Sequence, residues 1–226
     1  TLPADFANDP VRLARFEQEA RLLASVNHPN IAAIYGLEEC DGTRFLVLEL
    51  VDGETLADRL NRGALPIEEA LRLGIQVTEG LEAAHERGVI HRDIKPANIV
   101  VNTRGQVKIL DFGLATTAHP MDSESALPTF APDNQRLTNP GAVLGTARYA
   151  APEQALGSPV GPRSDLYALA LVLAESVTGE VPFAADTTVG TLTARTQRHL
   201  SVPDDLGLLK AVLERATRLR DFPGAP

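Results

Sequence analysis

The chain has 226 residues, of which 44% are apolar and 23% charged, an ordinary composition for a globular protein that excludes wholesale disorder. Its formal net charge of -9 excludes a broad basic surface and argues against duplex nucleic acid as the main partner. Cys40 is the single cysteine, so an intrachain disulfide is excluded and a reducing compartment is expected.

Neither a membrane span nor an export signal is predicted within the chain. The apolar run from Leu166 to Ala174 is far shorter than the roughly 20 residues needed to cross a bilayer, and it predicts a core helix. Residues 1–10 have neither a basic start nor an apolar core. We therefore expect a cytoplasmic location, with any membrane anchor outside this chain, as in the cytoplasmic domain of a longer membrane-anchored protein.

The first fifty residues predict one helix and one hairpin. Asp9-Pro10 places a capping residue before a proline suited to the first helical turn, and apolar side chains then recur at helical spacing. Two runs of strand-forming residues, 31–39 and 45–51, flank Asp41-Gly42, a favoured hairpin dipeptide. Because an isolated hairpin is marginal in water, we expect further strands upstream.

The chain up to Gly88 then predicts two helices. Thr55 is suited to cap a short helix, and Pro66 opens a long one that runs through Arg87 and ends at Gly88. Apolar side chains at helical spacing predict the buried stripe of the long helix: Ala70, Leu73, Val77, Leu81 and Ala84.

Residues 88–113, GVIHRDIKPANIVVNTRGQVKILDFG, combine charged side chains with strand patterns. Short runs of Ile, Val and Leu predict strands, and turns are predicted at 95–97 and 103–105. The charged and amide side chains are therefore expected at the ends of buried strands.

The rest of the chain predicts a long loop followed by helices. Residues 115–139 are rich in Pro, Ser, Thr, Ala and Asp and lack any period, which predicts a long, flexible surface loop. Helices are expected at 163–178, 187–198 and 204–220, and the first is apolar nearly all round, as in a central buried helix. The order is a small mixed segment followed by a mainly helical one.

Several motifs follow one another along the chain. Residues 91–98 match H-R-D-x-K-x-x-N, residues 111–113 are Asp-Phe-Gly, and Gly145-Thr146 and Ala151-Pro152-Glu153 precede Asp165. With these motifs the chain resembles the eukaryotic-type, or Hanks-type, serine/threonine protein kinase family in its bacterial branch. The resemblance implies an α+β, protein-kinase-like bilobal fold. A partial N-lobe of one helix plus a hairpin would occupy 1–51, and a mainly helical C-lobe, shortened at its end, would occupy 52–226.

The resemblance implies phosphoryl transfer from ATP to a serine or threonine hydroxyl of a protein. Asp93 would accept the proton of that hydroxyl and orient it, and Lys95 would place a cation on the transferring phosphate. Asn98 and Asp111 would hold Mg²⁺, a hard cation that takes oxygen ligands and bridges ATP phosphates. Lys95 and Thr146 also match the serine/threonine-directed branch of the family.

Other matching residues imply support roles. His91 would bond the backbone near the Asp-Phe-Gly turn, which Gly113 completes. Arg92 would pair with a phosphate on the activation loop, a plain salt bridge being the alternative. Asp165 would anchor the backbone of the catalytic loop through hydrogen bonds, and it can cap its own helix at the same time.

The resemblance places nucleotide-binding groups at both ends of the first fifty residues. Glu19 would pair with a lysine of the preceding strand, but no lysine precedes it in this chain. We therefore expect that lysine and the glycine-rich loop upstream of Thr1. Backbone groups of Glu49 and Val51 would bond the adenine of ATP, and Val100 would pack beneath it.

Residues 111–153 resemble the activation segment, which phosphorylation orders by pairing a phosphate with arginine. Thr138 is the first candidate for the phosphorylated residue, and an unmodified polar loop is the alternative. The resemblance also implies a dimer for autophosphorylation of this segment. Glu153, which closes the segment, would pair with Arg218 or Arg220. The other candidates for phosphorylation are Thr129, Ser123 and Ser125.

Two alternatives stay open on the sequence alone. A pseudokinase or scaffold module would keep the fold without transfer, and the absent lysine favours it, whereas the complete D-x-K-x-x-N and Asp-Phe-Gly motifs oppose it. A V-A-I-K sequence just upstream, after a glycine-rich loop, would favour the kinase, and a native start at Thr1 would favour the scaffold. A small-molecule kinase such as an aminoglycoside phosphotransferase fits less well, since the helical region after Glu153 and the long Ser/Thr-bearing loop suit protein substrates.

Overall fold

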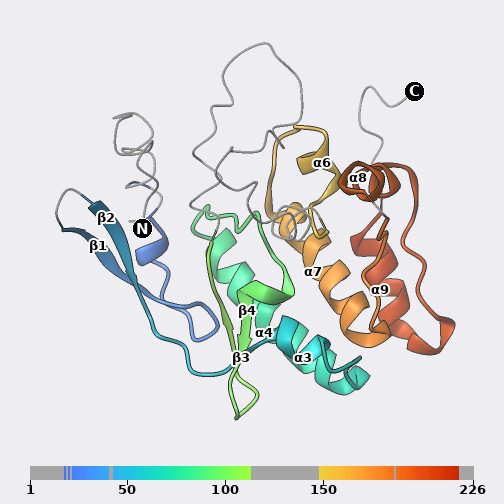
Figure 1. Ribbon diagram of the computed structural model, residues 1–226, viewed down its shortest axis with the longest axis horizontal. Helices are drawn as coiled ribbons and strands as arrows, with labels where there is room; N and C mark the ends of the chain where they lie inside the picture. The colour runs from blue at the N-terminus through green and yellow to red at the C-terminus, as the bar shows by residue number, and fades with distance from the viewer. Residues whose placement is uncertain are drawn as a thin grey trace. The chain divides into compact units, whose positions relative to one another are not determined.

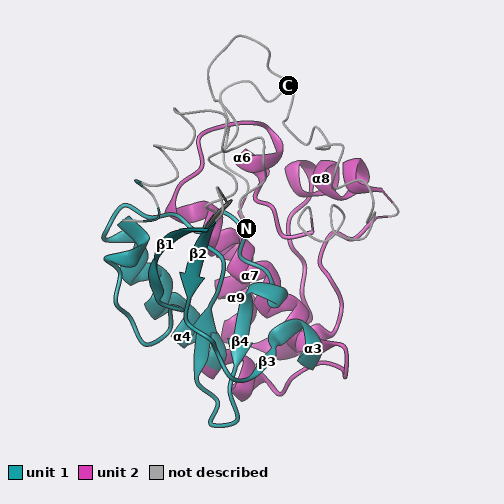
Figure 2. Cartoon of the chain, turned by 60° about the vertical axis from the view of Figure 1, so that its left-hand side comes forward, with its two compact units in different colours: residues 1–59, 73–125 teal, residues 60–72, 126–226 magenta. Residues whose placement is uncertain are grey.

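The computed structural model divides by internal contacts into two compact units (Figure 2). Unit 1 comprises residues 1–59 and 73–125, and unit 2 comprises residues 60–72 and 126–226. The predicted boundary between lobes after Val51 stays a prediction. The residues that the structure describes are 18, 20, 22–40, 43–112, 148–185 and 187–218.

The predicted hairpin is confirmed, with shorter strands than expected. β1 (Ile34–Cys40) pairs antiparallel with β2 (Thr43–Leu48) (Figure 1). In this pairing Leu37 lies opposite Leu46. The first strand starts late because the preceding residues bond elsewhere: the Ala32 N–H donates to the Ile109 carbonyl at 2.9 Å. Residues 18, 20 and 22–24 are helical, and the rest of the predicted first helix lies outside the described residues.

A second, three-stranded sheet carries the segment rich in charged residues. β3 (Glu54–Thr55) pairs with β4 (Ile99–Val101), which pairs with β5 (Val107–Ile109), all antiparallel. Gly53 enters this sheet with φ +148°, and a Cβ there would lie 2.6 Å from the Val101 carbonyl oxygen. Only glycine allows so close an approach without a shift of the backbone.

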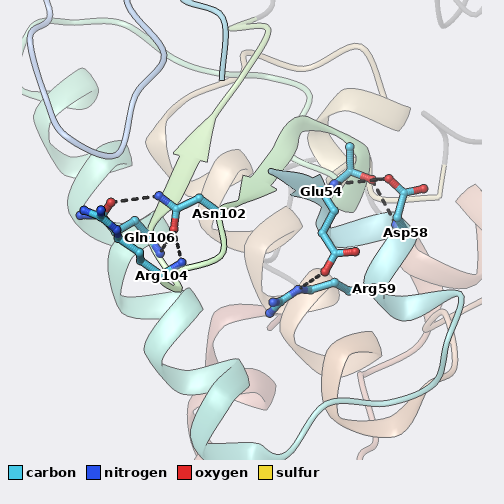
Figure 3. Close-up of polar contacts among 7 residues, drawn as sticks. Glu54, Asp58, Arg59, Asn102, Arg104 and Gln106 are labelled. Carbon is cyan, nitrogen blue, oxygen red and sulfur yellow. Dashed lines mark hydrogen bonds and ion pairs between the residues drawn. The ribbon is translucent and has the colours of Figure 1, made fainter. Parts of the chain in front are cut away.

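Local side chains close the predicted turn and start the predicted short helix (Figure 3). In the β4–β5 turn, the Asn102 side-chain oxygen accepts from the backbone N–H groups of Arg104 at 2.9 Å and Gln106 at 3.0 Å. The hydroxyl of Thr55 accepts from the Asp58 N–H at 3.1 Å at the start of α3 (Leu56–Leu60). Thr55 therefore caps this helix, as predicted.

The long helix, α4 (Ile67–His85), has the buried stripe that its apolar spacing predicts. It ends two residues before Arg87, and the chain turns at Gly88, which adopts φ +75°. The stripe residues are all buried: Ala70, Leu73, Val77, Leu81 and Ala84.

Unit 2 has its core around α7 (Pro162–Thr178), which is buried as predicted. α7 packs with α9 (Leu208–Ala216), and both contribute to one apolar cluster. The prediction of one helix over 204–220 is wrong, because η2 (Asp204–Leu206) is separated from α9 by Gly207 at φ +55°. Two further helices described in this unit are α6 (Pro152–Ala155) and α8 (Thr188–Gln197).

We searched the described helices for a membrane span. In those parts of the chain, no helix is both long and apolar enough to cross a membrane.

Candidate active site

Asp93 is the centre of a polar cluster formed by the loop before β4. Its Oδ2 oxygen accepts from the Lys95 ammonium at 2.6 Å and from the Asn98 amide at 3.2 Å. The Asn98 amide also donates to the Asp93 carbonyl oxygen at 2.9 Å. A short 3-10 turn, η1 (Pro96–Asn98), brings the three side chains together. The sequence pattern D-x-K-x-x-N therefore folds into one contact network.

Asn98 connects this cluster to Asp111. Asn98 is only 6% exposed, and its carbonyl accepts from the Leu110 N–H at 2.8 Å, one residue before Asp111. The backbone at Asp111 adopts φ +51°, a conformation that few residues other than glycine take. Arg92, beside Asp93, likewise has φ +67°. Strained backbone at both ends of the cluster is typical of functional sites.

Asp111 and Asn98 suit a hard cation. Asp111 presents an exposed side chain, and the Asn98 amide nitrogen donates both bonds to Asp93, so the Asn98 Oδ1 oxygen is suited to face a cation. Mg²⁺ is commonly held by one or two carboxylates together with substrate phosphates. Among the described residues, no group of three or more His, Cys, Asp or Glu side chains could hold a metal. Asp111 and Asn98 would supply two oxygen ligands, which suits a cation whose other ligands are phosphate oxygens and water.

His91 is fully buried under the cluster and bonds backbone on both sides. Its Nε2 lies 2.9 Å from the Leu110 carbonyl oxygen, and its Nδ1 accepts from the Asp93 N–H at 3.2 Å. A carbonyl only accepts and an N–H only donates, so the proton of the ring belongs on Nε2. The ring also lies 4.5 Å, centroid to centroid, from that of Phe112. His91 thus connects the backbone at Asp93 to the backbone that precedes Asp111.

The segment expected to meet adenine follows β2 directly. The Glu49 N–H donates to the Ala33 carbonyl at 2.8 Å. Within the described parts of the chain, neither the Glu49 carbonyl nor the Val51 N–H takes part in a backbone hydrogen bond. Val100 is buried. Its side chain lies close to Gly53, since the Val100 Cγ1 atom is 2.9 Å from the position that a Cβ atom on Gly53 would occupy.

Lys108 lies close to Glu49, a contact that the motifs do not predict. The Glu49 carboxylate accepts from the Lys108 ammonium at 2.8 Å and from the Ala33 N–H at 2.9 Å. Burial raises the pKa of Glu49, but the hydrogen bonds from Lys108 and Ala33 and the charge of Lys108 outweigh it, so this pKa lies below its usual value. The sequence feature that could have indicated this contact is the position of Lys108 between two buried strand residues, Val107 and Ile109.

Two predicted residues of unit 2, Glu153 and Asp165, lie at the start of helices. The Glu153 carboxylate accepts from the Ser164 hydroxyl, and among the described residues no ion pair joins it to Arg218. The predicted pairing of Glu153 with Arg218 or Arg220 stays a prediction, since Arg220 lies outside the described residues. Asp165 is buried in the first turn of α7. A fully buried arginine that the sequence did not single out, Arg195 of α8, donates to the Ala150 carbonyl at 3.0 Å.

Some predicted site residues lie outside the described residues. They include the expected partner of the ATP-binding lysine and the candidates for phosphorylation. Their roles stay predictions. They are Glu19, Gly113, Ser123, Ser125, Thr129, Thr138, Thr146 and Arg220.

Comparison with known proteins identifies the family. A model of the protein kinase domain matches residues 6–215, so this chain belongs to the protein kinase family. The chain is 42% identical over 208 residues to the serine/threonine-protein kinase PknA of Mycobacterium tuberculosis, covering 89% of this chain and 44% of that protein. It is 38% identical over 226 residues to the serine/threonine-protein kinase PknB of Mycobacterium leprae, covering 93% of this chain and 34% of that protein. The chain thus spans less than half the length of these relatives.

Proposed function

We propose that this chain is the catalytic domain of a serine/threonine protein kinase, which transfers the γ-phosphate of ATP to a protein hydroxyl. The proposal rests chiefly on the cluster in which Asp93 contacts both Lys95 and Asn98. The names of the related proteins support the same activity. ATP is the phosphate donor in this proposal, and Asn98 and Asp111 hold Mg²⁺.

Each residue of the cluster has a distinct part in the transfer. Asp93 keeps its Oδ2 oxygen on Lys95 and Asn98, so Oδ1 is the atom that orients the substrate hydroxyl and takes its proton. The hydroxyl oxygen forms a bond to the γ-phosphorus as the bond from that phosphorus to the bridging oxygen of ADP breaks. Lys95 stabilises the charge on the transferring group. Mg²⁺, when bound, neutralises charge on the phosphate oxygens.

A transfer assay on the full-length product of the gene tests the proposal. With radiolabelled ATP, Mg²⁺ and a general protein substrate such as casein or myelin basic protein, we expect acid-stable label on serine or threonine, and EDTA should abolish it. Binding of ATP and Mg²⁺ without transfer to any protein, itself included, would contradict the proposal. That outcome would instead favour a scaffold module.

The remaining roles are part of the same proposal. Arg92 pairs with a phosphate on the activation segment, and Asp165 anchors the backbone of the catalytic loop. A dimer allows one copy to phosphorylate the other. The domain works in the cytoplasm, where ATP and protein substrates are available.

Replacement of Thr138 by alanine is expected to prevent activation by phosphorylation. The physical reason is that a phosphate on Thr138 would add about two negative charges, which Arg92 can pair. The measurement compares the activity of Thr138→Ala and Thr129→Ala after incubation with ATP. Unchanged activity of a folded Thr138→Ala variant would exclude Thr138 as the regulatory residue.

A further inference from the structure

Glu49 and Lys108 form an ion pair in unit 1 that lies apart from the catalytic loop. The Lys108 ammonium is 2.8 Å from the Glu49 Oε2 oxygen, and the two side chains are 25% and 24% exposed. The same ammonium donates to the Ile31 carbonyl at 3.2 Å, and the same Oε2 oxygen accepts from the Ala33 N–H at 2.9 Å. The pair therefore has charge and backbone partners at once, unlike a plain surface ion pair.

Each partner of the pair belongs to a different part of the proposed ATP site. Glu49 starts the segment whose backbone would bond adenine. Lys108 lies on β5, and the end of that strand leads through Leu110, whose N–H bonds the Asn98 carbonyl, to Asp111. The ion pair thus links the backbone proposed to bind adenine to the strand that leads to Asp111, a proposed Mg²⁺ ligand.

The segment after Glu49 has little else to hold it. Residues 49–53 lie outside the strands, and the Leu50 side chain is 90% exposed, so packing fixes it weakly. At its start, the Glu49 N–H donates to the Ala33 carbonyl, and the Glu49 carboxylate accepts from Lys108 and from the Ala33 N–H. Loss of the ion pair would leave this start held by the two bonds between Glu49 and the Ala33 backbone, without a link to β5, and the backbone would sample more positions.

We propose that Lys108 and the Glu49 carboxylate are positioning residues for ATP, because they hold the backbone at 49–51 at a fixed place relative to Asp111. This inference rests on the proposed function, since it assigns a role within the same ATP site. Correct spacing lets one nucleotide reach both the adenine-binding backbone and the cation site. Loss of the pair costs affinity for ATP and leaves the transfer residues in place.

Lys108→Met tests the inference, because methionine keeps the length of the side chain and removes its charge. We expect the KM for ATP and the Kd for ADP to rise by about 3- to 30-fold, the usual range for residues that couple two parts of a site. The kcat and the KM for the protein substrate should stay within about 2-fold of the parent. Lys108→Arg, which keeps the charge, should restore most of the affinity.

Lys210→Met is the matched control. Lys210 of α9 also pairs with a carboxylate, that of Asp204 in η2, but both residues belong to unit 2. Its replacement should leave the affinity for ADP unchanged. If Lys108→Met does not fold, Glu49→Gln is the second test of the inference. The glutamine side chain still accepts from the Ala33 N–H but carries no charge, so this variant should also bind ADP more weakly.

Several outcomes would overturn the inference. One is an unchanged affinity for ADP in a folded Lys108→Met or Glu49→Gln variant. The others are a rise in kcat with unchanged affinity for ATP in these variants, and a lowered melting temperature as their only change. The Kd for ADP is measured without transfer. A parent protein that binds ADP but phosphorylates nothing would therefore defeat the proposed function and still allow this test.

Discussion

Replacement of Asp93 by asparagine is expected to lower turnover by about 10²- to 10⁴-fold, the usual range for loss of a general base. Asparagine keeps the size of the side chain and one acceptor oxygen, so the hydroxyl can still be oriented, but an amide does not take its proton. The ion pair with Lys95, at 2.6 Å in the parent, is lost as well. Single-turnover rates in the full-length protein, at saturating ATP and Mg²⁺, measure the effect.

The control for this prediction is Asp205→Asn, which makes the same chemical change at an exposed position of η2. Its turnover should equal that of the parent. The Kd for ADP should also be nearly unchanged in Asp93→Asn, because Asp93 is assigned no contact with adenine. Phosphorylation at close to the parental rate by Asp93→Asn would remove Asp93 from its proposed role.

Local patterns predicted the elements well and their ends less well. The buried stripe of α4 follows from its apolar spacing, and the burial of α7 follows from its apolar side chains on nearly all sides. The start of β1 at Ile34 depends instead on Ala32, whose N–H bonds Ile109, 77 residues away in the chain. The break at Gly207 needs a positive φ that the helical pattern of 204–220 conceals. Long-range pairing and single backbone angles are not visible in periodicity.

Motif spacing located the centre of the candidate site but missed part of its support. Asp93, Lys95 and Asn98 are near neighbours in the chain, so one turn brings them together. Lys108 meets Glu49 across 59 positions, and Arg195 meets the Ala150 carbonyl across 45. Neither contact follows from a pattern of residues close in sequence, and both needed the folded chain.

Replacement of His91 by alanine is expected to lower the free energy of unfolding by about 2 to 4 kcal/mol. His91 is fully buried, so the change leaves a cavity beside Phe112 and removes the partners of the Leu110 carbonyl and the Asp93 N–H. Urea unfolding measures the effect, with His199→Ala as the control, because His199 is exposed.

His91→Phe separates packing from hydrogen bonding at the same position. Phenylalanine fills the space and keeps a ring against Phe112, but it leaves the Leu110 carbonyl and the Asp93 N–H without the imidazole, at a cost of about 1 to 3 kcal/mol. Because those two backbone groups flank Asp111 and Asp93, we expect turnover to fall more in His91→Phe than its loss of stability explains. Parental stability in His91→Phe would show instead that the imidazole acts only by filling space.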